Sequence, residues 1–263
     1  MNPSLETLHQ TPAVTVISEM LTDFKSISLN EMDRVLFLTR FDSKYFINTD
    51  LLQQILEAVK DDYFVLETAG KRIQSYETIY FDTSNDRFYL EHHNGRSTRM
   101  KLRKREYSDS GIVFLEIKKK NNKGQISKKR MEISGLGSDL SPEEIAFVKK
   151  NTNLNGDKLE AKFESTFKRI TLVSKNFDER CTIDLDLRFN SYSAEKSDLK
   201  GLVIAELKQD RQFLRSKMAA ILKEHKLQKI SFSKYCFGRA INEGDLKSNV
   251  FKPGIRQIKN QLK

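Results

Sequence analysis

The sequence predicts an α+β domain built mainly from antiparallel β-strands. Charged and apolar residues alternate along several segments, as expected of strands that bury one face. A few stretches with helical spacing lie between these segments. No internal repeat, low-complexity tract or linker divides the 263 residues, and a chain of this length can bury a sizeable core. We therefore expect one α+β unit.

Helices are predicted where apolar residues recur at intervals of three and four. The predicted helices cover 16–38, 48–62, 141–151 and 213–239. The third starts with Ser141 and Pro142 and has acids in its first turn, which is typical of a helix start. His92 and His93 stand beside Asn94-Gly95 and are expected in a loop, with structural or solvent roles.

Strands are predicted where apolar and polar residues alternate or β-branched residues cluster. They cover 75–83, 99–107, 112–120, 126–133, 167–175, 179–189 and 201–209. Residues 121–124, Asn-Asn-Lys-Gly, are expected to form the turn of a hairpin.

The chain is strongly basic. Lys and Arg number 46 against 36 Asp and Glu, which gives a net charge of +10. Such an excess indicates an anionic partner, whether nucleic acid, a phosphorylated metabolite or an acidic membrane surface. Cys181 and Cys236 lack metal-ligand spacing, so a disulfide framework or a zinc site is not expected. There is no signal-peptide pattern and no apolar run long enough to span a bilayer, so we expect a cytoplasmic protein.

The cations follow the period of a β-strand. Arg99, Lys101, Arg103 and Arg105 occupy every second position of one segment, and Met100 and Leu102 fall on its other face. Other predicted strands repeat this pattern, with charged or polar faces formed by Arg40, Asp42 and Lys44; Glu116, Lys118 and Lys120; Lys128 and Arg130; Arg180, Thr182, Asp184, Asp186 and Arg188; and Glu206 and Lys208.

Two arrangements are compatible with such strands. The charges can face solvent around an apolar core, or they can line a polar tunnel whose apolar outer face is covered by helices. The residues alone leave both open. The mixture of many cations with a few carboxylates is nevertheless what a metal-bridged polyphosphate requires, because cations neutralise phosphate oxygens and carboxylates bind Mg²⁺ or Mn²⁺.

Seven motifs resemble one family in their order along the chain. They read LTRFDSKYFI, SYETIYFDT, HHNGRSTRMKLRKREY, FLEIKKKNNKGQISKKR, RCTIDLDLRF, VIAELKQ and FSKYCFG. From about Arg40 to Arg239 the sequence is similar to the VTC domain, the catalytic domain of the vacuolar transporter chaperone complex. This family belongs to the triphosphate tunnel metalloenzymes. The resemblance implies an antiparallel eight-stranded β-barrel (triphosphate tunnel) with flanking helices and with the charges inside.

The resemblance also implies three parts of the chain and a set of site residues. The parts are an N-terminal helical segment 1–39 that packs on the barrel, a tunnel domain 40–243, and a basic tail 244–263 that is predicted as a solvated helix end. The expected catalytic residues are Lys44, Lys101, Arg103, Lys118 and Arg180; the substrate-binding residues are Arg40, Lys128, Arg130, Arg169, Lys208 and Lys234; and the metal ligand is Glu206. Glu116 either holds a second metal or pairs with a cation.

One departure bears on the reaction. Tunnel hydrolases of the superfamily begin with Glu-x-Glu-x-Lys, and this chain has Arg40-x-Asp42-x-Lys44. Loss of a carboxylate weakens a second metal site and the activation of water, neither of which a polymerase needs. The resemblance therefore implies an ATP-dependent polyphosphate polymerase that uses Mn²⁺ or Mg²⁺. The alternatives are a tripolyphosphatase or nucleoside triphosphatase of the same fold, and a non-catalytic module that binds polyphosphate or nucleic acid.

The expected partners are ATP and inorganic polyphosphate or triphosphate, with nucleic acid not expected. The sequence identifies no membrane-protein partner and sets no oligomeric state.

Overall fold

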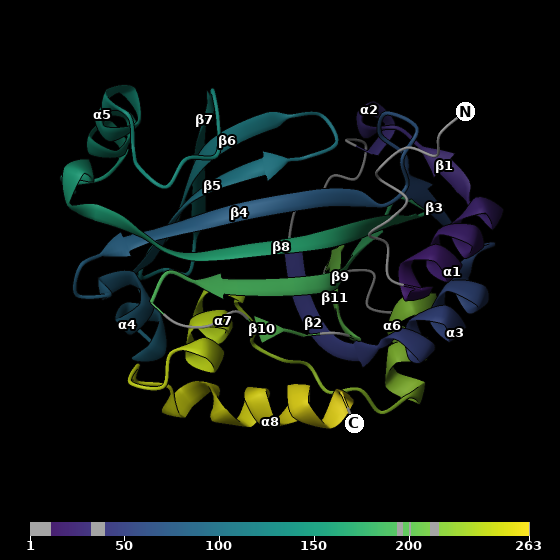
Figure 1. Ribbon diagram of the computed structural model, residues 1–263. Helices are drawn as coiled ribbons and strands as arrows, with labels where there is room; N and C mark the ends of the chain where they lie inside the picture. Colours follow the sequence, from purple (N-terminus) through teal and green to yellow (C-terminus); the bar gives the residue numbers. More distant parts are fainter. Residues whose placement is uncertain (1–11, 33–39, 194–196, 200, 211–215, 263) are drawn as a thin grey trace.

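The fold is a large, curved antiparallel sheet with helices around it (Figure 1). The computed structural model describes residues 12–32, 40–193, 197–199, 201–210 and 216–262. Eight strands follow one another in the order β2-β11-β9-β8-β4-β5-β6-β7, and every neighbouring pair is antiparallel. They are β2 (Arg40–Asn48), β4 (Gln74–Thr83), β5 (Arg99–Tyr107), β6 (Ile112–Lys120), β7 (Ile126–Ile133), β8 (Leu159–Ser174), β9 (Glu179–Ser191) and β11 (Leu202–Asp210).

The predicted fold class is confirmed. The eight strands and the flanking helices are present, although β2 and β7 end the strand order and no hydrogen bonds close the sheet between them within the described residues. Three short strands extend the sheet: β1 (Lys25–Ile27) pairs in parallel with β3 (Tyr63–Leu66), β3 also pairs with β8, and β10 (Ser197–Asp198) pairs with β9.

The apolar outer face of the sheet is covered by helices at two places. At one end, α1 (Pro12–Met20), α3 (Thr49–Val59) and α6 (Lys217–Glu224) pack on β2, β8, β9 and β11 and bury Ile17, Leu52 and Met218 (Figure 1, right). At the other end, α5 (Pro142–Asn151) places Val148 against Leu102 and neighbouring residues of β5 and β6. The outer face therefore provides the hydrophobic cores, and the inner face is left for polar side chains.

A third cluster fills part of the inner side. The helix α7 (Lys234–Asn242) buries Tyr235 and Phe237 against aromatic residues of the strands, among them Phe46, Tyr80 and Phe163. Figure 1 shows α7 between the sheet and α8 (Lys252–Gln261). The chain reaches this position by crossing the β2 edge, where the backbone N–H of Ile230 donates to the Lys44 carbonyl.

Most of the predicted strands and two of the helices are observed. The ranges 99–107, 112–120 and 126–133 coincide with β5, β6 and β7. The helix α5 starts with a capping box, in which the Ser141 hydroxyl accepts from the N–H of Glu144 and the Glu144 carboxylate accepts from the N–H of Ser141.

Three predicted elements are wrong in part. The proposed helix 16–38 ends early, and residues 25–27 form β1; residues 33–38 lie outside the described part of the chain. The described part of the proposed helix 213–239 contains two helices separated by the crossing segment 225–233, and residues 213–215 lie outside the described part of the chain. His92 and His93 do not lie in a loop, since they form the last turn of α4 (Arg87–His93).

The prediction that Asp186 and Arg188 share a face with Asp184 is also wrong. A bulge in β9 inserts a residue at this point, because Thr166 pairs with Arg188 while Lys168 pairs with Leu185. Asp186 adopts a left-handed conformation with φ 52°. The side-chain alternation shifts by one, so Leu187 joins the inner aromatic cluster and Arg188 is exposed.

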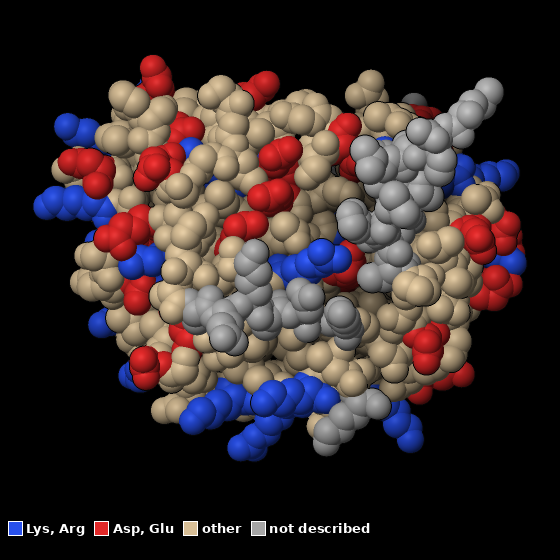
Figure 2. Space-filling model, viewed as in Figure 1, with Lys and Arg blue, Asp and Glu red and all other residues tan. Residues whose placement is uncertain are grey.

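The basic tail forms a packed amphipathic helix. Ile258 of α8 is buried against the inner cluster, and Lys252, Arg256 and Lys259 face solvent. Figure 2 shows these cations as a row of Lys and Arg along the lower edge of the molecule, where α8 lies. Among the described residues, no helix combines the length and the apolar character needed to cross a membrane.

Candidate active site

The inward-facing charges of the sheet meet at one cavity. This cavity has a volume of about 490 Å³ and is lined by residues of β4 to β9 and β11. Its charged lining residues are Arg103, Arg105, Glu116, Lys118, Lys128, Lys129, Arg130, Arg169, Arg180 and Lys208. Of the two arrangements that the sequence left open, the structure has the one with the charges inside.

The strand pairing explains how the cations come together. Lys101 stands opposite Lys118, and Lys118 opposite Lys128, so three strands each contribute a lysine at one level of the inner face. Two residues further along β5, Arg103 stands opposite Glu116, and Glu116 stands opposite Arg130. Inward residues two positions apart are roughly 7 Å apart along a strand. The cations therefore form successive levels along the cavity wall.

The charges of this wall perturb one another. Partial desolvation in the wall lowers the pKa of Lys118 to about 8, and the charges of Lys101 and Lys128 act in the same direction. Burial also lowers the pKa of Lys101, whose Nζ donates to the Ser233 hydroxyl at 2.8 Å. Arg103 donates to Glu116 at 2.6 Å, and the pKa of Glu116 is lowered because Arg103 and Arg105 outweigh the effect of its burial.

Glu206 faces the same space from β11. Its Oε1 lies 2.9 Å from Lys208 Nζ and 3.6 Å from Lys44 Nζ. Burial alone would raise the pKa of Glu206, but Lys208 and Lys44 outweigh it and lower the value to about 2. Glu206 is therefore ionised throughout the neutral range.

A second carboxylate, Asp184 of β9, pairs with two cations. It accepts two hydrogen bonds from Arg169, at 2.5 and 2.8 Å, and one from Lys234 at the start of α7. Burial would raise the pKa of Asp184, yet Arg169 and Lys234 hold it well below its usual range. The ammonium of Lys234 also lies 4.1 Å from the centre of the Phe167 ring. Asp184 thus links the inner wall of the sheet to α7.

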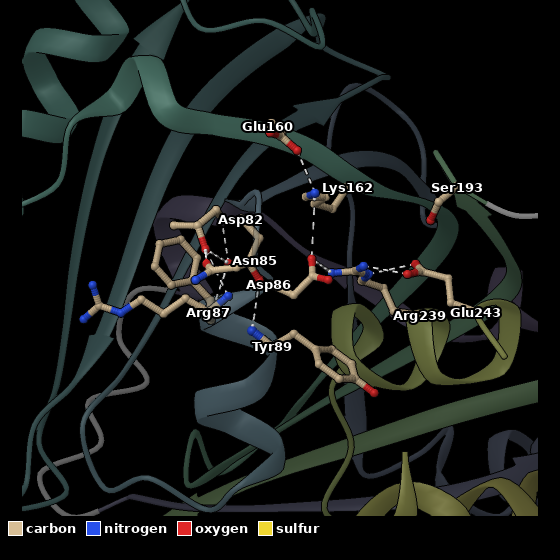
Figure 3. Close-up of polar contacts among 12 residues, drawn as sticks. Asp82, Asn85, Asp86, Arg87, Tyr89, Glu160, Lys162, Ser193, Arg239 and Glu243 are labelled. Atoms are coloured by element: carbon tan, nitrogen blue, oxygen red, sulfur yellow. Dashed lines mark hydrogen bonds and ion pairs between the residues drawn. The ribbon is translucent and has the colours of Figure 1, made fainter. Parts of the chain in front are cut away.

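The position of α7 is fixed by a polar network, and Figure 3 shows the part of it around Arg239, Asp86 and Glu243. Arg239 donates to Asp86 at 2.6 Å and to both oxygens of Glu243, at 2.7 and 2.5 Å. The hydroxyl of Tyr235 donates to Asp82 at 2.6 Å, and Asp82 in turn accepts from the backbone N–H groups of Phe88 and Tyr89 at the start of α4 and from that of Thr83. These contacts hold α7 so that its N-cap Ser233 and its first residue Lys234 reach Lys101 and Asp184 of the inner wall.

Most of the chain matches one known family. Residues 39–242, well over half of the chain, match the family model described as the VTC domain. The chain belongs to the VTC domain family. A comparison with curated proteins found no match.

Solved structures similar to this VTC domain include three cyclase-type proteins. A candidate adenylate cyclase from Vibrio parahaemolyticus has 13% identity and a TM-score of 0.44, with 76% of this chain and 97% of that chain covered. A candidate adenylate cyclase from Bacillus halodurans has 11% identity and a TM-score of 0.48, with coverage of 74% and 94%. A candidate adenylyl cyclase from Hippeastrum, described as having a dominant triphosphatase activity, has 14% identity and a TM-score of 0.48, with coverage of 80% and 98%. Values this low support no conclusion about the activity of this chain.

The structure brings most of the predicted site residues of the VTC domain to one place. Arg103, Lys118, Arg180, Lys128, Arg130, Arg169, Lys208 and Glu116 line the cavity, and Lys44, Lys101, Lys234 and Glu206 are joined to its wall by the contacts given above. Lys128 and Arg130 lie on the exposed β7 and form the open side of the site. Arg40 begins β2, and its side chain lies outside the described part of the structure.

The residues of the VTC domain fit a divalent ion in one specific way. Among the described residues, no three His, Cys, Asp or Glu side chains are grouped as a metal cage. Mg²⁺ is usually held by one or two carboxylates together with substrate phosphates and water. Glu206 and Glu116 both suit this mode, because both are ionised and each uses one oxygen for its cations, Oε1 of Glu206 for Lys208 and Oε2 of Glu116 for Arg103. Their side chains are 18% and 20% exposed, and Glu116 lines the cavity.

Three residues of the site were not assigned a role from the sequence. Arg105 had the same period-2 signal as Arg103 and lines the cavity, and burial lowers its pKa to about 10. Asp184 lay on a predicted polar face, but its two partners come from β8 and α7 and could not be read from local pattern. Tyr80 stacks on Tyr235, and its pKa is lowered because four neighbouring cations, Arg103 first among them, outweigh its burial.

Proposed function

We propose that this protein is a polyphosphate polymerase that transfers the γ-phosphoryl group of ATP to the end of a phosphate chain inside its cationic cavity. The observation that carries this proposal is the length of the cation series on the inner wall. On β5 it runs from Arg105 through Arg103 and Lys101 to Arg99, and on β6 Lys118 and Lys120 stand opposite its far end. Six residues of extended strand span roughly 20 Å. A triphosphate occupies only part of such a series, whereas a growing chain can use all of it.

The proposed reaction requires the protein mainly to supply positive charge and to hold the two reactants in position. A terminal oxygen of the chain attacks the γ-phosphorus, a new P–O bond forms, the bond to the β,γ-bridging oxygen breaks, and ADP leaves. The nucleophile is already anionic, so no group has to remove a proton from it. Lys101, Arg103, Lys118 and Arg180 are proposed to neutralise the repulsion between the two anions and to hold them in line.

The remaining charged residues are proposed to bind and orient the substrate. Lys128, Arg130 and Lys208 would hold phosphate oxygens along the wall, and Arg40 and Lys44 would act from β2. Arg169 and Lys234 are already bound to Asp184, so their part is to fix the wall and offer their remaining donors. A Mg²⁺ or Mn²⁺ ion bound at Glu206 would supply further positive charge next to the phosphates.

The test is a product analysis. Purified protein is incubated with ATP, Mn²⁺ and a short polyphosphate primer, and acid-labile chains are separated by size. Long chains together with ADP support the proposal. Free phosphate without chains identifies a hydrolase, and neither product identifies a binding module. The Lys118→Gln variant should lose most of the synthesis, and Lys150→Gln, which removes an exposed lysine of α5, should not.

A further inference from the structure

One end of the cavity is aromatic and apolar. Beyond Arg105 the inner face continues with Tyr107 of β5 and Tyr76 of β4, and Phe114 of β6 stands beside Arg105. Tyr76 pairs directly with Tyr107 and Arg105 with Phe114, so the three rings form a row across the sheet next to the first cations. The ring centres of Tyr76 and Tyr107 are 5.1 Å apart, and those of Tyr107 and Phe114 are 6.0 Å apart.

This aromatic end is part of the cavity and not a sealed core. Tyr76 and Tyr107 line the same cavity as Arg103 and Arg105, together with the apolar side chains of Leu29, Met32 and Leu66. Both tyrosines are only partly buried, and 49% of the Leu29 surface is exposed. An inorganic phosphate chain has no apolar group that could pack on such a surface. A ligand that combines a flat apolar ring with a polyanion would use both parts of the cavity.

We propose that Tyr76 and Tyr107, with Leu29, Met32 and Leu66 beside them, form the subsite for the base of a purine nucleoside triphosphate. The inference rests on the proposed polymerase function and adds to it the position and direction of the nucleotide. A base stacks on aromatic side chains regardless of its hydrogen-bonding edge, and a purine offers the larger stacking area. Arg105 and Arg169, which lie 5.6 and 5.3 Å from the Tyr76 ring, then meet the first phosphates.

The direction of synthesis follows from this placement. With the base at Tyr107, the triphosphate extends along β5 toward Arg103 and Lys101, and the γ-phosphate lies deepest. The acceptor chain must approach from the other side, along Arg99 and Lys120. That far end is also strongly cationic, because Arg99 stands opposite Lys120 and Lys101 opposite Lys118. Burial, together with the charges of Lys101, Arg99 and Lys120, lowers the pKa of His92 nearby to about 3. The product chain is thus expected to leave past α4 and not past Leu29.

The test compares ATP with ribose 5-triphosphate, which carries the same triphosphate group and no base. Binding is measured by calorimetry without divalent metal, so that no turnover occurs. Base stacking contributes ~1–3 kcal/mol, so the wild-type protein should bind ATP roughly fivefold or more tightly than ribose 5-triphosphate. Tyr107→Leu should remove this difference and leave ribose 5-triphosphate within about twofold of the wild-type value, and Tyr107→Phe should retain it.

Two further measurements separate stacking from a structural role. Tyr192→Leu removes an exposed tyrosine far along the chain from the subsite and should leave both affinities unchanged. The chain has no tryptophan, so the emission of etheno-ATP can be followed cleanly; it should be quenched by the wild-type protein and much less by Tyr107→Leu.

Equal binding of ATP and ribose 5-triphosphate by the wild-type protein, or an equal loss of both in Tyr107→Leu, would overturn the base subsite. Failure of the wild-type protein to bind ATP would overturn it as well. The product analysis distinguishes this result from a failure of the proposed function. If phosphate chains form but ATP binds no better than ribose 5-triphosphate, the base subsite is wrong and the polymerase function stands. If Tyr107→Leu weakens only ATP binding but no chains form, the base subsite stands and the polymerase function is wrong.

Discussion

Replacement of Glu206 by glutamine should have opposite effects on the empty and the phosphate-bound protein. Glu206 is the partner of Lys44 and Lys208, and its side chain is 18% exposed. Its pKa is lowered from 4.5 to about 2. A pKa lowered by one corresponds to about 1.4 kcal/mol, so the ionised carboxylate stabilises the fold by up to about 3 kcal/mol. Because the folded-state pKa is depressed, this stability is present above about pH 4.5 and is lost as the pH falls toward 2.

The Glu206→Gln variant lacks that contribution at neutral pH. For a protein of this size, each kcal/mol changes the melting temperature by roughly 2–4 °C, so the variant should melt up to about 6–12 °C below the wild type. Its Lys44 and Lys208 have lost their counter-charge. Tripolyphosphate without metal should therefore raise the melting temperature of the variant more than that of the wild type, because the anion replaces the missing carboxylate.

With divalent metal present, tripolyphosphate should stabilise the wild type more than the Glu206→Gln variant. In the wild type, Mn²⁺ should add to the stabilisation by tripolyphosphate and support ATP-to-polyphosphate activity, while in Glu206→Gln it should add little and the activity should fall by orders of magnitude. The assay is thermal melting with tripolyphosphate, with and without Mn²⁺, beside the product analysis; Glu224→Gln, at an exposed position of α6, is the control. Unchanged stability and a full metal response in Glu206→Gln would refute the reasoning.

Three other outcomes follow from the structure. Millimolar tripolyphosphate should raise the wild-type melting temperature, more at low salt than at high salt, and a temperature that does not move at either salt would argue against an anion site. Gly238→Ala should loosen α7 at a cost of about 1–3 kcal/mol, because the new Cβ would lie 2.0 Å from Phe163 Cζ; Gly135→Ala, with no atom within 4 Å, is the control in the same denaturation experiment. Tripolyphosphate affinity should fall as the pH rises through about 8, where Lys118 loses its proton; titration of Lys118→Arg, which keeps its charge, should lack this step, and the same pH profile in both proteins would disprove the assignment.

The strand faces of the site were predictable because side-chain alternation has a period of two. The spacing of Arg99, Lys101, Arg103 and Arg105 is enough to place these cations on one face, and β5 keeps that alternation from end to end. The choice between an inward and an outward charged face was not predictable from the residues. It depends on where the helices pack, and the same apolar strand face serves either arrangement.

Other features depended on tertiary contacts. The bulge at Asp186 adds one residue to β9 and turns Leu187 and Phe189 into the inner cluster, and nothing in the local alternation marks it. The break between α6 and α7 arises because residues 225–233 cross the β2 edge, where Ile230 pairs with Lys44. Helical spacing continues through neighbouring segments and does not show that they lie on opposite faces of a sheet.

The inner wall carries more positive charge than the fold needs, and this excess is consistent with a sliding substrate. Three carboxylates, Glu116, Asp184 and Glu206, bind the cations that fix the geometry of the wall. Lys101 and Lys118 have no carboxylate within ion-pair distance among the described residues. The fold tolerates them because its stability comes mainly from the apolar cores under the outer helices and from the aromatic contacts of α7.

In the proposed polymerase reaction, a phosphate chain would exchange one set of lysine and arginine contacts for the next as it advances. Successive inward cations on β5 are similar in type and roughly 7 Å apart. Glu206 and Asp184 lie on β11 and β9, and the aromatic row lies at the Arg105 end of the series. Such a division would hold the nucleotide in one place and let the chain move, which a polymerase needs at every cycle and a hydrolase does not.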